Sequence, residues 1–139
     1  RVERILFAAT KADHLPTSQH DELKRLLTSL LNEAQSRSAV AGARTSVMAL
    51  AGLRTTAPAT ATLDGHTVDC VSGIPTDSDT VEAVYPGKLP RDLVDLKNLA
   101  PGDLEILSFK PPASMEEIRP FPHINLDRAL EELLGDLLQ

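Results

Sequence analysis

The sequence predicts an α/β fold with a parallel sheet, on the basis of three observations. Two short apolar runs, at residues 5–9 and 46–51, are typical of buried parallel strands. The segment between them carries apolar side chains at helical spacing. A strand, a helix and a second strand in this order form the right-handed crossover unit of such a sheet. With 139 residues, of which 42% are hydrophobic, the chain is long enough for one domain with a core.

The first apolar run ends in a polar loop at residues 10–16, after which a helix is expected. Ser18 is expected to cap this helix together with Asp21 three residues later, and the helix should end near Arg37. Its apolar stripe consists of Leu23, Leu26, Leu27, Leu30, Leu31 and Ala34. Because the chain reaches its first apolar run by residue 5 with no methionine, cap or leader before it, we expect a fragment that begins mid-domain.

After residue 55 the sequence becomes rich in Thr, Val and turn residues. Residues 60–63 and 66–71 flank Asp64-Gly65, a two-residue turn that predicts a β-hairpin. Most of the ten prolines lie beyond residue 57 and divide residues 73–122 into short pieces. Within these pieces we expect a helical turn at residues 91–96, a strand at residues 104–109 and loops.

The chain closes with a second predicted helix, which Asn125 is expected to cap. Its apolar stripe consists of Leu126, Leu130, Leu133, Leu134, Leu137 and Leu138.

Charge and cysteine content narrow the classes of function. The 20 Asp and Glu against 14 Lys and Arg would repel the phosphate backbone of a nucleic acid. The single cysteine, Cys70, allows no internal disulfide and is expected to be a buried, inert thiol, and the four histidines lack metal-site spacing. No apolar run approaches the roughly 20 residues of a membrane span. We therefore expect a cytoplasmic protein with no nucleic-acid partner, metal ligands or membrane span.

The candidate functional residues are Thr10, Lys11 and Asp13, in a loop between the first strand and the helix. In an open α/β sheet, ligands bind outside the carboxyl ends of the strands, where this loop is expected. The Asp13 carboxylate can accept two parallel hydrogen bonds from guanine, whereas adenine offers no such pair of donors. The Lys11 stem can lie over the base. The alternative is a helix-entry loop in which Asp13 serves as a capping group.

A companion candidate lies at the end of the second strand, at Ala49, Leu50 and Ala51. These small or apolar residues would allow a backbone N–H to approach the guanine carbonyl oxygen. The alternative is a strand end packed tightly against a helix. His20, just inside the first helix, is expected to tether the loop rather than to catalyse.

Six segments of the chain are similar in sequence to a known protein family: residues 7–15, 18–20, 42–44, 47–51, 120–124 and 126–130. Together they resemble the C-terminal third of the YcjX-like bacterial P-loop GTPases, over the whole chain. The resemblance implies part of a Ras-like, three-layer P-loop NTPase core, with GTP or GDP and Mg²⁺ as ligands. It also implies a Thr-Lys-x-Asp guanine motif, matched by Thr10, Lys11 and Asp13. By position it places the second guanine loop at residues 49–51, where the Ser-Ala pair usual in Ras-like proteins is absent.

The same resemblance implies a division of the chain into three parts. In a Ras-like domain, the strand with the second guanine loop runs directly into the final helix. Residues 55–122 are therefore expected as an insertion between core parts at residues 1–54 and 123–139. An insertion of this kind is expected to offer a surface to a protein partner.

The chain by itself shows no route to phosphoryl transfer. A phosphate-binding loop requires Gly, four residues, Gly-Lys and then Ser or Thr. The only Gly-Lys pair, Gly87-Lys88, has Glu82 in place of the first glycine and Leu89 in place of the hydroxyl residue. No Asp stands three positions before any of the seven glycines, so the Asp-x-x-Gly of a second switch is missing as well. We expect the catalytic residues and the Mg²⁺ ligands outside this chain.

Two hypotheses of function follow. In the first, the chain is the guanine-nucleotide-binding part of a P-loop GTPase and supplies base recognition, while other segments hydrolyse GTP. In the second, it is a non-enzymatic protein-interaction module in which the Thr-Lys-Ala-Asp loop occurs by chance.

Overall fold

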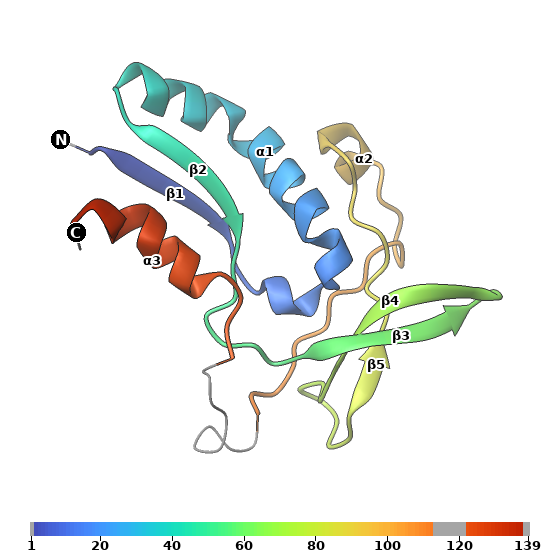
Figure 1. Ribbon diagram of the computed structural model, residues 1–139. Helices are drawn as coiled ribbons and strands as arrows, with labels where there is room; N and C mark the ends of the chain where they lie inside the picture. The colour runs from blue at the N-terminus through green and yellow to red at the C-terminus, as the bar shows by residue number, and fades with distance from the viewer. Residues whose placement is uncertain (1, 113–121, 138–139) are drawn as a thin grey trace.

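The computed structural model describes residues 2–112 and 122–137 (Figure 1). Strands β1 (Arg4–Ala9) and β2 (Arg44–Ala49) form a parallel pair, and helix α1 (His20–Val40) connects them. The predicted strand–helix–strand unit is therefore confirmed. Helix α1 runs past the expected end near Arg37, because no helix-breaking residue precedes Gly42, whose φ of 84° turns the chain toward β2.

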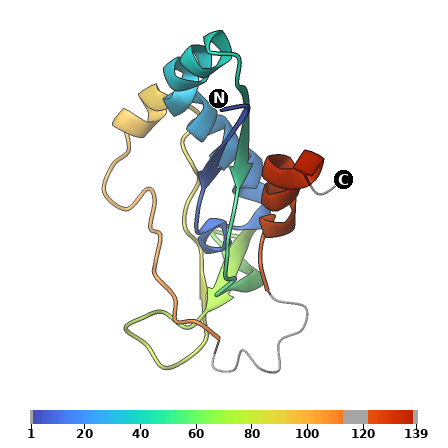
Figure 2. The ribbon, with the colours of Figure 1, turned by 90° about the vertical axis from the view of Figure 1, so that its left-hand side faces the viewer.

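Helices α1 and α3 (Leu126–Leu134) cover opposite faces of the β1–β2 pair (Figures 1 and 2). This arrangement confirms the α/β class. Helix α3 continues into a 3₁₀ turn, Gly135–Leu137, and is tied to the sheet by Arg4, whose guanidinium donates to the Glu132 carbonyl at 2.8 Å and pairs with Asp136. The side chains that form the core are small or aliphatic near the ends of the strands, where Ala49 and Ala51 are almost fully buried.

The caps predicted for the two helices were wrong. Ser18 lies in a 3₁₀ turn, Thr17–Gln19, and the residue before α1 is Gln19, which makes no capping bond with its side chain. Asn125 precedes α3 but has a φ of 57°, outside the extended region that a capping side chain needs. Its amide instead donates to the Ala49 carbonyl at 2.9 Å, and His123 Nδ1 accepts from the first helical N–H.

A second sheet follows the first unit and is antiparallel. Strands β3 (Ala57–Leu63) and β4 (His66–Gly73) form the predicted hairpin, and β5 (Glu82–Val84) pairs with the end of β4. The turn residues Asp64 and Gly65 have φ of 48° and 79°, as a tight two-residue turn of this hand requires. In Figure 1 the hairpin projects away from the parallel pair. Strand β5 was not predicted, because it is short and shows no alternation of polar and apolar residues.

The strand predicted at residues 104–109 was wrong. This segment makes only isolated bridges, Gly87↔Leu104 and Pro75↔Phe109, in place of a continuous ladder. One reason is that its partner segments contain Pro75 and Pro86, which have no N–H to donate. The helical turn expected at residues 91–96 is helix α2 (Leu93–Lys97), in which the N–H groups of Val94 and Asp95 donate to the Asp92 carboxylate.

Parts of three sequence predictions lie outside the described residues. These are the family-like segment at residues 120–124, the end of the final apolar stripe at Leu138, and the last part of the expected insertion. Over the described ranges, no helix is long and apolar enough to cross a membrane.

Candidate functional site

The loop after β1 is held rigidly at the carboxyl end of the parallel pair. Ala12 N donates to Leu50 O at 3.0 Å and so attaches the loop to the end of β2. The His20 ring contacts the carbonyls of Ala12 at 2.8 Å and Leu15 at 3.2 Å, and because both are acceptors, Nε2 must carry the proton and donate. The predicted tethering role of His20 is confirmed. Lys11 has a φ of 57°, a left-handed conformation that costs about 1 kcal/mol or more for a residue with a side chain.

Asp13 is a nearly buried carboxylate, with 3% of its surface exposed. Its Oδ2 accepts two hydrogen bonds from Thr55, one from the backbone N–H and one from the hydroxyl, both at 2.7 Å. Its main-chain carbonyl accepts a third from the Thr56 hydroxyl. A carboxylate has about four acceptor positions in all. Within the described ranges only Oδ2 is used, so Oδ1 keeps its capacity for a ligand.

A cavity of about 350 Å³ lies beside Asp13, and we call it the Asp13 cavity. Its lining comes from three separate segments of the chain: Thr10, Lys11, Asp13 and His14; Ala51, Gly52, Leu53 and Thr55; and Ser108 and Phe109. The three residues predicted from the Thr-Lys-x-Asp motif are therefore brought together at one cavity. Its volume is within the range of small-molecule sites.

The structure separates the residues of the second candidate loop. Ala51 lines the Asp13 cavity, whereas Ala49 and Leu50 do not. The N–H of Leu50 donates to Ala9 O at 2.8 Å, and the N–H of Ala51 donates to Ile124 O at 3.1 Å. These two N–H groups thus extend the backbone pairing of β2, and the next two residues along the chain, Gly52 and Leu53, reach the cavity instead.

Comparison with known proteins identifies the family of the chain. The family model described as the YcjX-like family, DUF463, matches residues 1–138. The chain belongs to the YcjX-like family.

Two curated relatives carry the name Ras-like GTPase YcjX. The protein from Escherichia coli is 32% identical over 138 residues, which cover 99% of this chain and 30% of the relative. The protein from Shewanella oneidensis is 29% identical over 143 residues, which cover 100% of this chain and 29% of the relative. The chain thus spans less than a third of the length of these relatives.

Several residues of this YcjX-like chain line the cavity but were not predicted as site residues, among them Thr55, Ser108 and Phe109. Thr55 follows the end of β2, which lies next to β1 in a parallel pair, so a hydroxyl there was a usable signal. Phe109 is one of only three phenylalanines in the chain, yet no local pattern connects residue 109 with residue 13. Its position depends on pairing between distant segments.

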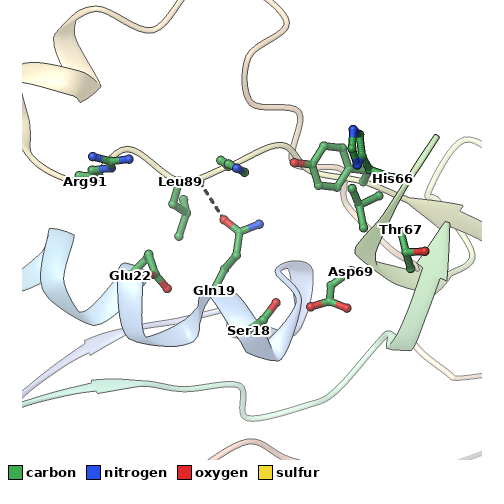
Figure 3. A pocket seen from close by; sticks show the side chains of 11 residues that line it. Ser18, Gln19, Glu22, His66, Thr67, Asp69, Leu89 and Arg91 are labelled. Atoms are coloured by element: carbon green, nitrogen blue, oxygen red, sulfur yellow. Dashed lines mark hydrogen bonds between the residues drawn. The ribbon is translucent and has the colours of Figure 1, made fainter. Parts of the chain in front are cut away.

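A larger groove of about 560 Å³ lies elsewhere on the YcjX-like chain, between the start of α1, strand β4 and residues 85–91 (Figure 3). We call it the Gln19 groove. The Gln19 amide bridges the two sides, donating to Gly87 O at 2.7 Å and accepting from Leu89 N at 2.8 Å. Carboxylates and cations both line it, so the lining does not favour one sign of charge. The groove contains none of the predicted site residues.

Over residues 2–112 and 122–137, neither Cys70 nor a cluster of acidic side chains forms a second candidate site. Cys70 is 1% exposed, and burial, followed by the charge of Asp69, raises the pKa of its thiol above the ordinary value, which disfavours the reactive thiolate. The expectation of a buried thiol is therefore confirmed. In the part of the chain that the structure describes, no group of three or more His, Cys, Asp or Glu side chains could hold a metal ion.

Proposed function

We propose that this chain supplies guanine recognition in a GTP-binding and GTP-hydrolysing protein. The observation that carries the proposal is the position of Asp13: a nearly buried carboxylate that lines a cavity with Thr10 and Lys11, at the carboxyl end of a parallel strand. The name of the two relatives, Ras-like GTPase, supports the reaction class.

The chemistry of Asp13 fits a base that offers two N–H donors. Guanine presents its ring N–H and its exocyclic amine on one edge, and a carboxylate can accept both in a charge-assisted pair. Oδ2 already accepts two bonds from Thr55, so the ring N–H would bond to Oδ1, and the amine would replace the Thr55 hydroxyl at Oδ2. Adenine would leave Oδ1 without a donor, and a nearly buried acceptor left unsatisfied costs about 1 to 3 kcal/mol.

The neighbouring residues complete the proposed base site. The backbone of Lys11 has a left-handed conformation. The stem of its side chain would cover one face of the base. The companion donor to the guanine carbonyl would be the N–H of Gly52 or Leu53 rather than those of residues 49–51, because the latter extend the backbone pairing. A Cβ added to Gly52 would meet nothing within 4 Å, so its backbone faces open space.

The fold of the whole protein is part of the same proposal. We assign β1, α1, β2 and α3 to a Ras-like P-loop NTPase core, and residues 55–122 to an insertion. The parallel pair with helices on both faces supports the core, and the separate antiparallel sheet supports the insertion. The phosphate-binding loop and the Mg²⁺ ligands would then belong to the remaining part of the full-length protein, which also supplies the hydrolytic step.

The test is a change of base preference in the full-length protein. Wild type should bind GDP at least about 100-fold more tightly than ADP, because adenine offers no donor to Oδ1 of Asp13. Asp13→Asn should lose GDP affinity and gain affinity for xanthosine diphosphate, whose base offers an acceptor where guanine has its amine. Asp69→Asn is the matched control, since Asp69 lines the Gln19 groove and not the Asp13 cavity. Equal preference of Asp13→Asn and wild type for GDP over xanthosine diphosphate would refute the proposal.

The same experiment separates the alternative, an interaction module with a chance Thr-Lys-Ala-Asp loop. The two bonds that the Asp13 carboxylate accepts from Thr55 favour that alternative, because they give the carboxylate a structural role without any ligand. If the role is structural only, Asp13→Asn should lower stability while no nucleotide competes for the cavity.

A further inference from the structure

The segment after β5 returns to the loop that follows β1 and contacts it at His14. Phe109 is 7% exposed, and its ring meets that of His14 edge to face, with the centroids 5.4 Å apart. Ser108 and Phe109 line the Asp13 cavity on the side that the strand–helix–strand unit leaves open. Two segments separated by about a hundred residues in the sequence therefore share one cavity.

The position of Phe109 is fixed by its surroundings. Thr76 N donates to Ser108 O at 3.0 Å, and Lys110 N donates to Ile74 O at 2.7 Å, so both neighbours of Phe109 are bound to the chain that follows β4. A Cβ at Gly73 would lie 2.8 Å from the Phe109 ring, which means that the ring occupies space that only a glycine leaves free. The ring is thus held by backbone pairing and by close packing.

We propose that Ser108 and Phe109 form a wall of the base site, so that residues outside the Ras-like core contribute to nucleotide affinity. This inference rests on the proposed guanine site at Asp13. An apolar wall contacts a planar base and also excludes water from Asp13, which strengthens hydrogen bonds to the carboxylate. A ring has no means of distinguishing guanine from xanthine. Phe109 therefore contributes to affinity for purine nucleotides, while Asp13 determines which base is preferred.

The test uses two variants of the full-length protein with one control position. Ser108 is exposed, so Ser108→Trp should fill the mouth of the cavity without disturbing the core, and should weaken GDP binding at least 10-fold at an unchanged melting temperature. Phe109→Ala should weaken GDP binding by about 10-fold, as expected for loss of an aromatic contact with a base. In both variants the ratio of GDP to xanthosine diphosphate affinity should stay as in wild type.

Ile106 provides the control, because it belongs to the same segment, is 48% exposed and does not line the cavity. Ile106→Trp and Ile106→Ala should bind GDP as wild type does. If Ser108→Trp binds GDP as tightly as Ile106→Trp, Ser108 and Phe109 do not form a wall of the base site. This result decides the question even if Phe109→Ala is too unstable to measure.

The two proposals fail in different ways. A switch of preference in Asp13→Asn together with unchanged GDP affinity in Ser108→Trp would overturn the wall and leave the base recognition by Asp13 intact. If Asp13→Asn shows no switch, the guanine site fails, and the wall fails with it.

Discussion

The strand–helix–strand unit and the segment from β3 to Lys110 are held together in different ways. In the first, β1 and β2 pair over their full lengths, and helix α1 packs along them. In the second, the ladders of β3, β4 and β5 give way to single bridges at Phe109 and Leu104. Regular pairing spreads the stabilisation over many equivalent contacts, whereas single bridges concentrate it. We therefore expect single substitutions to have larger effects in the second region.

Gly87→Ala should give the largest loss of stability. Gly87 has a φ of 87°, and a Cβ there would lie 2.1 Å from the Asp103 carbonyl oxygen, at the single bridge that holds residue 104. Backbone strain and the clash together should cost about 3 kcal/mol or more in urea unfolding.

Gly102→Ala separates the two causes. Gly102 has a φ of 93° but open space around it. The substitution should therefore lower the free energy of unfolding by about 1 kcal/mol, through backbone strain alone. Equal losses of stability in Gly87→Ala and Gly102→Ala would show that the contact with Asp103 does not matter. The segment around Gly87 would then be able to shift and make room for a side chain.

Asn125→Ala should lower the free energy of unfolding by about 2 kcal/mol, because Asn125 makes a contact that supports the strand–helix–strand unit. The variant loses the bond to Ala49 O, worth about 1 kcal/mol, and it places an alanine at a φ of 57°, which costs about as much again. Asn125→Gly loses the same bond but relieves the strain, so its unfolding free energy should stay within about 0.5 kcal/mol of wild type. If Asn125→Gly is as unstable as Asn125→Ala, backbone strain does not contribute, and the loss of stability comes from the bond to Ala49 O alone.

These contacts also show how far the sequence could predict the structure. Periodicity and turn chemistry were sufficient for β1, α1, β2 and the β3–β4 hairpin, because each depends on neighbouring residues. Thr10, Lys11 and Asp13 of the Thr-Lys-x-Asp motif lie together at one cavity, and guanine binding there stays a prediction. Periodicity was not sufficient for residues 104–109, whose apolar pattern suits a strand but whose partners contain prolines. Nor could local rules connect Asp13 with Thr55 or Phe109, since these contacts form only after distant segments pair.

Gln19→Ala should have a smaller effect at the contact between the two regions. It removes two hydrogen bonds, to Gly87 O and from Leu89 N, and should cost about 1 to 2 kcal/mol. Hydrogen exchange should accelerate at the Leu89 amide while the amides of α1 keep their protection. Gln35→Ala, within α1, is the control and should change neither. Faster exchange along α1 as well would mean that the two regions unfold together.

Cys70→Ala should have the smallest effect on stability, and only at alkaline pH. The pKa of Cys70 is raised in the folded chain, so its contribution to stability is complete below the ordinary value of 9.0 and is lost as the pH rises above it. Relative to Cys70→Ala, wild type should therefore lose stability only above about pH 9, and iodoacetamide should label the thiol at pH 8 only after unfolding. Rapid labelling of the folded protein would contradict the burial of Cys70.

The position of a purine relative to Asp13 decides whether this chain recognises guanine, and a crystal structure of the full-length protein with GDP measures it directly. We expect the ring N–H and the exocyclic amine of guanine within about 3 Å of the Asp13 carboxylate, as charge-assisted bonds require. We also expect Lys11 along one face of the base and Phe109 at the wall of the cavity. A guanine bound in the Gln19 groove, or bound elsewhere with Asp13 still bonded only to Thr55, would contradict the account.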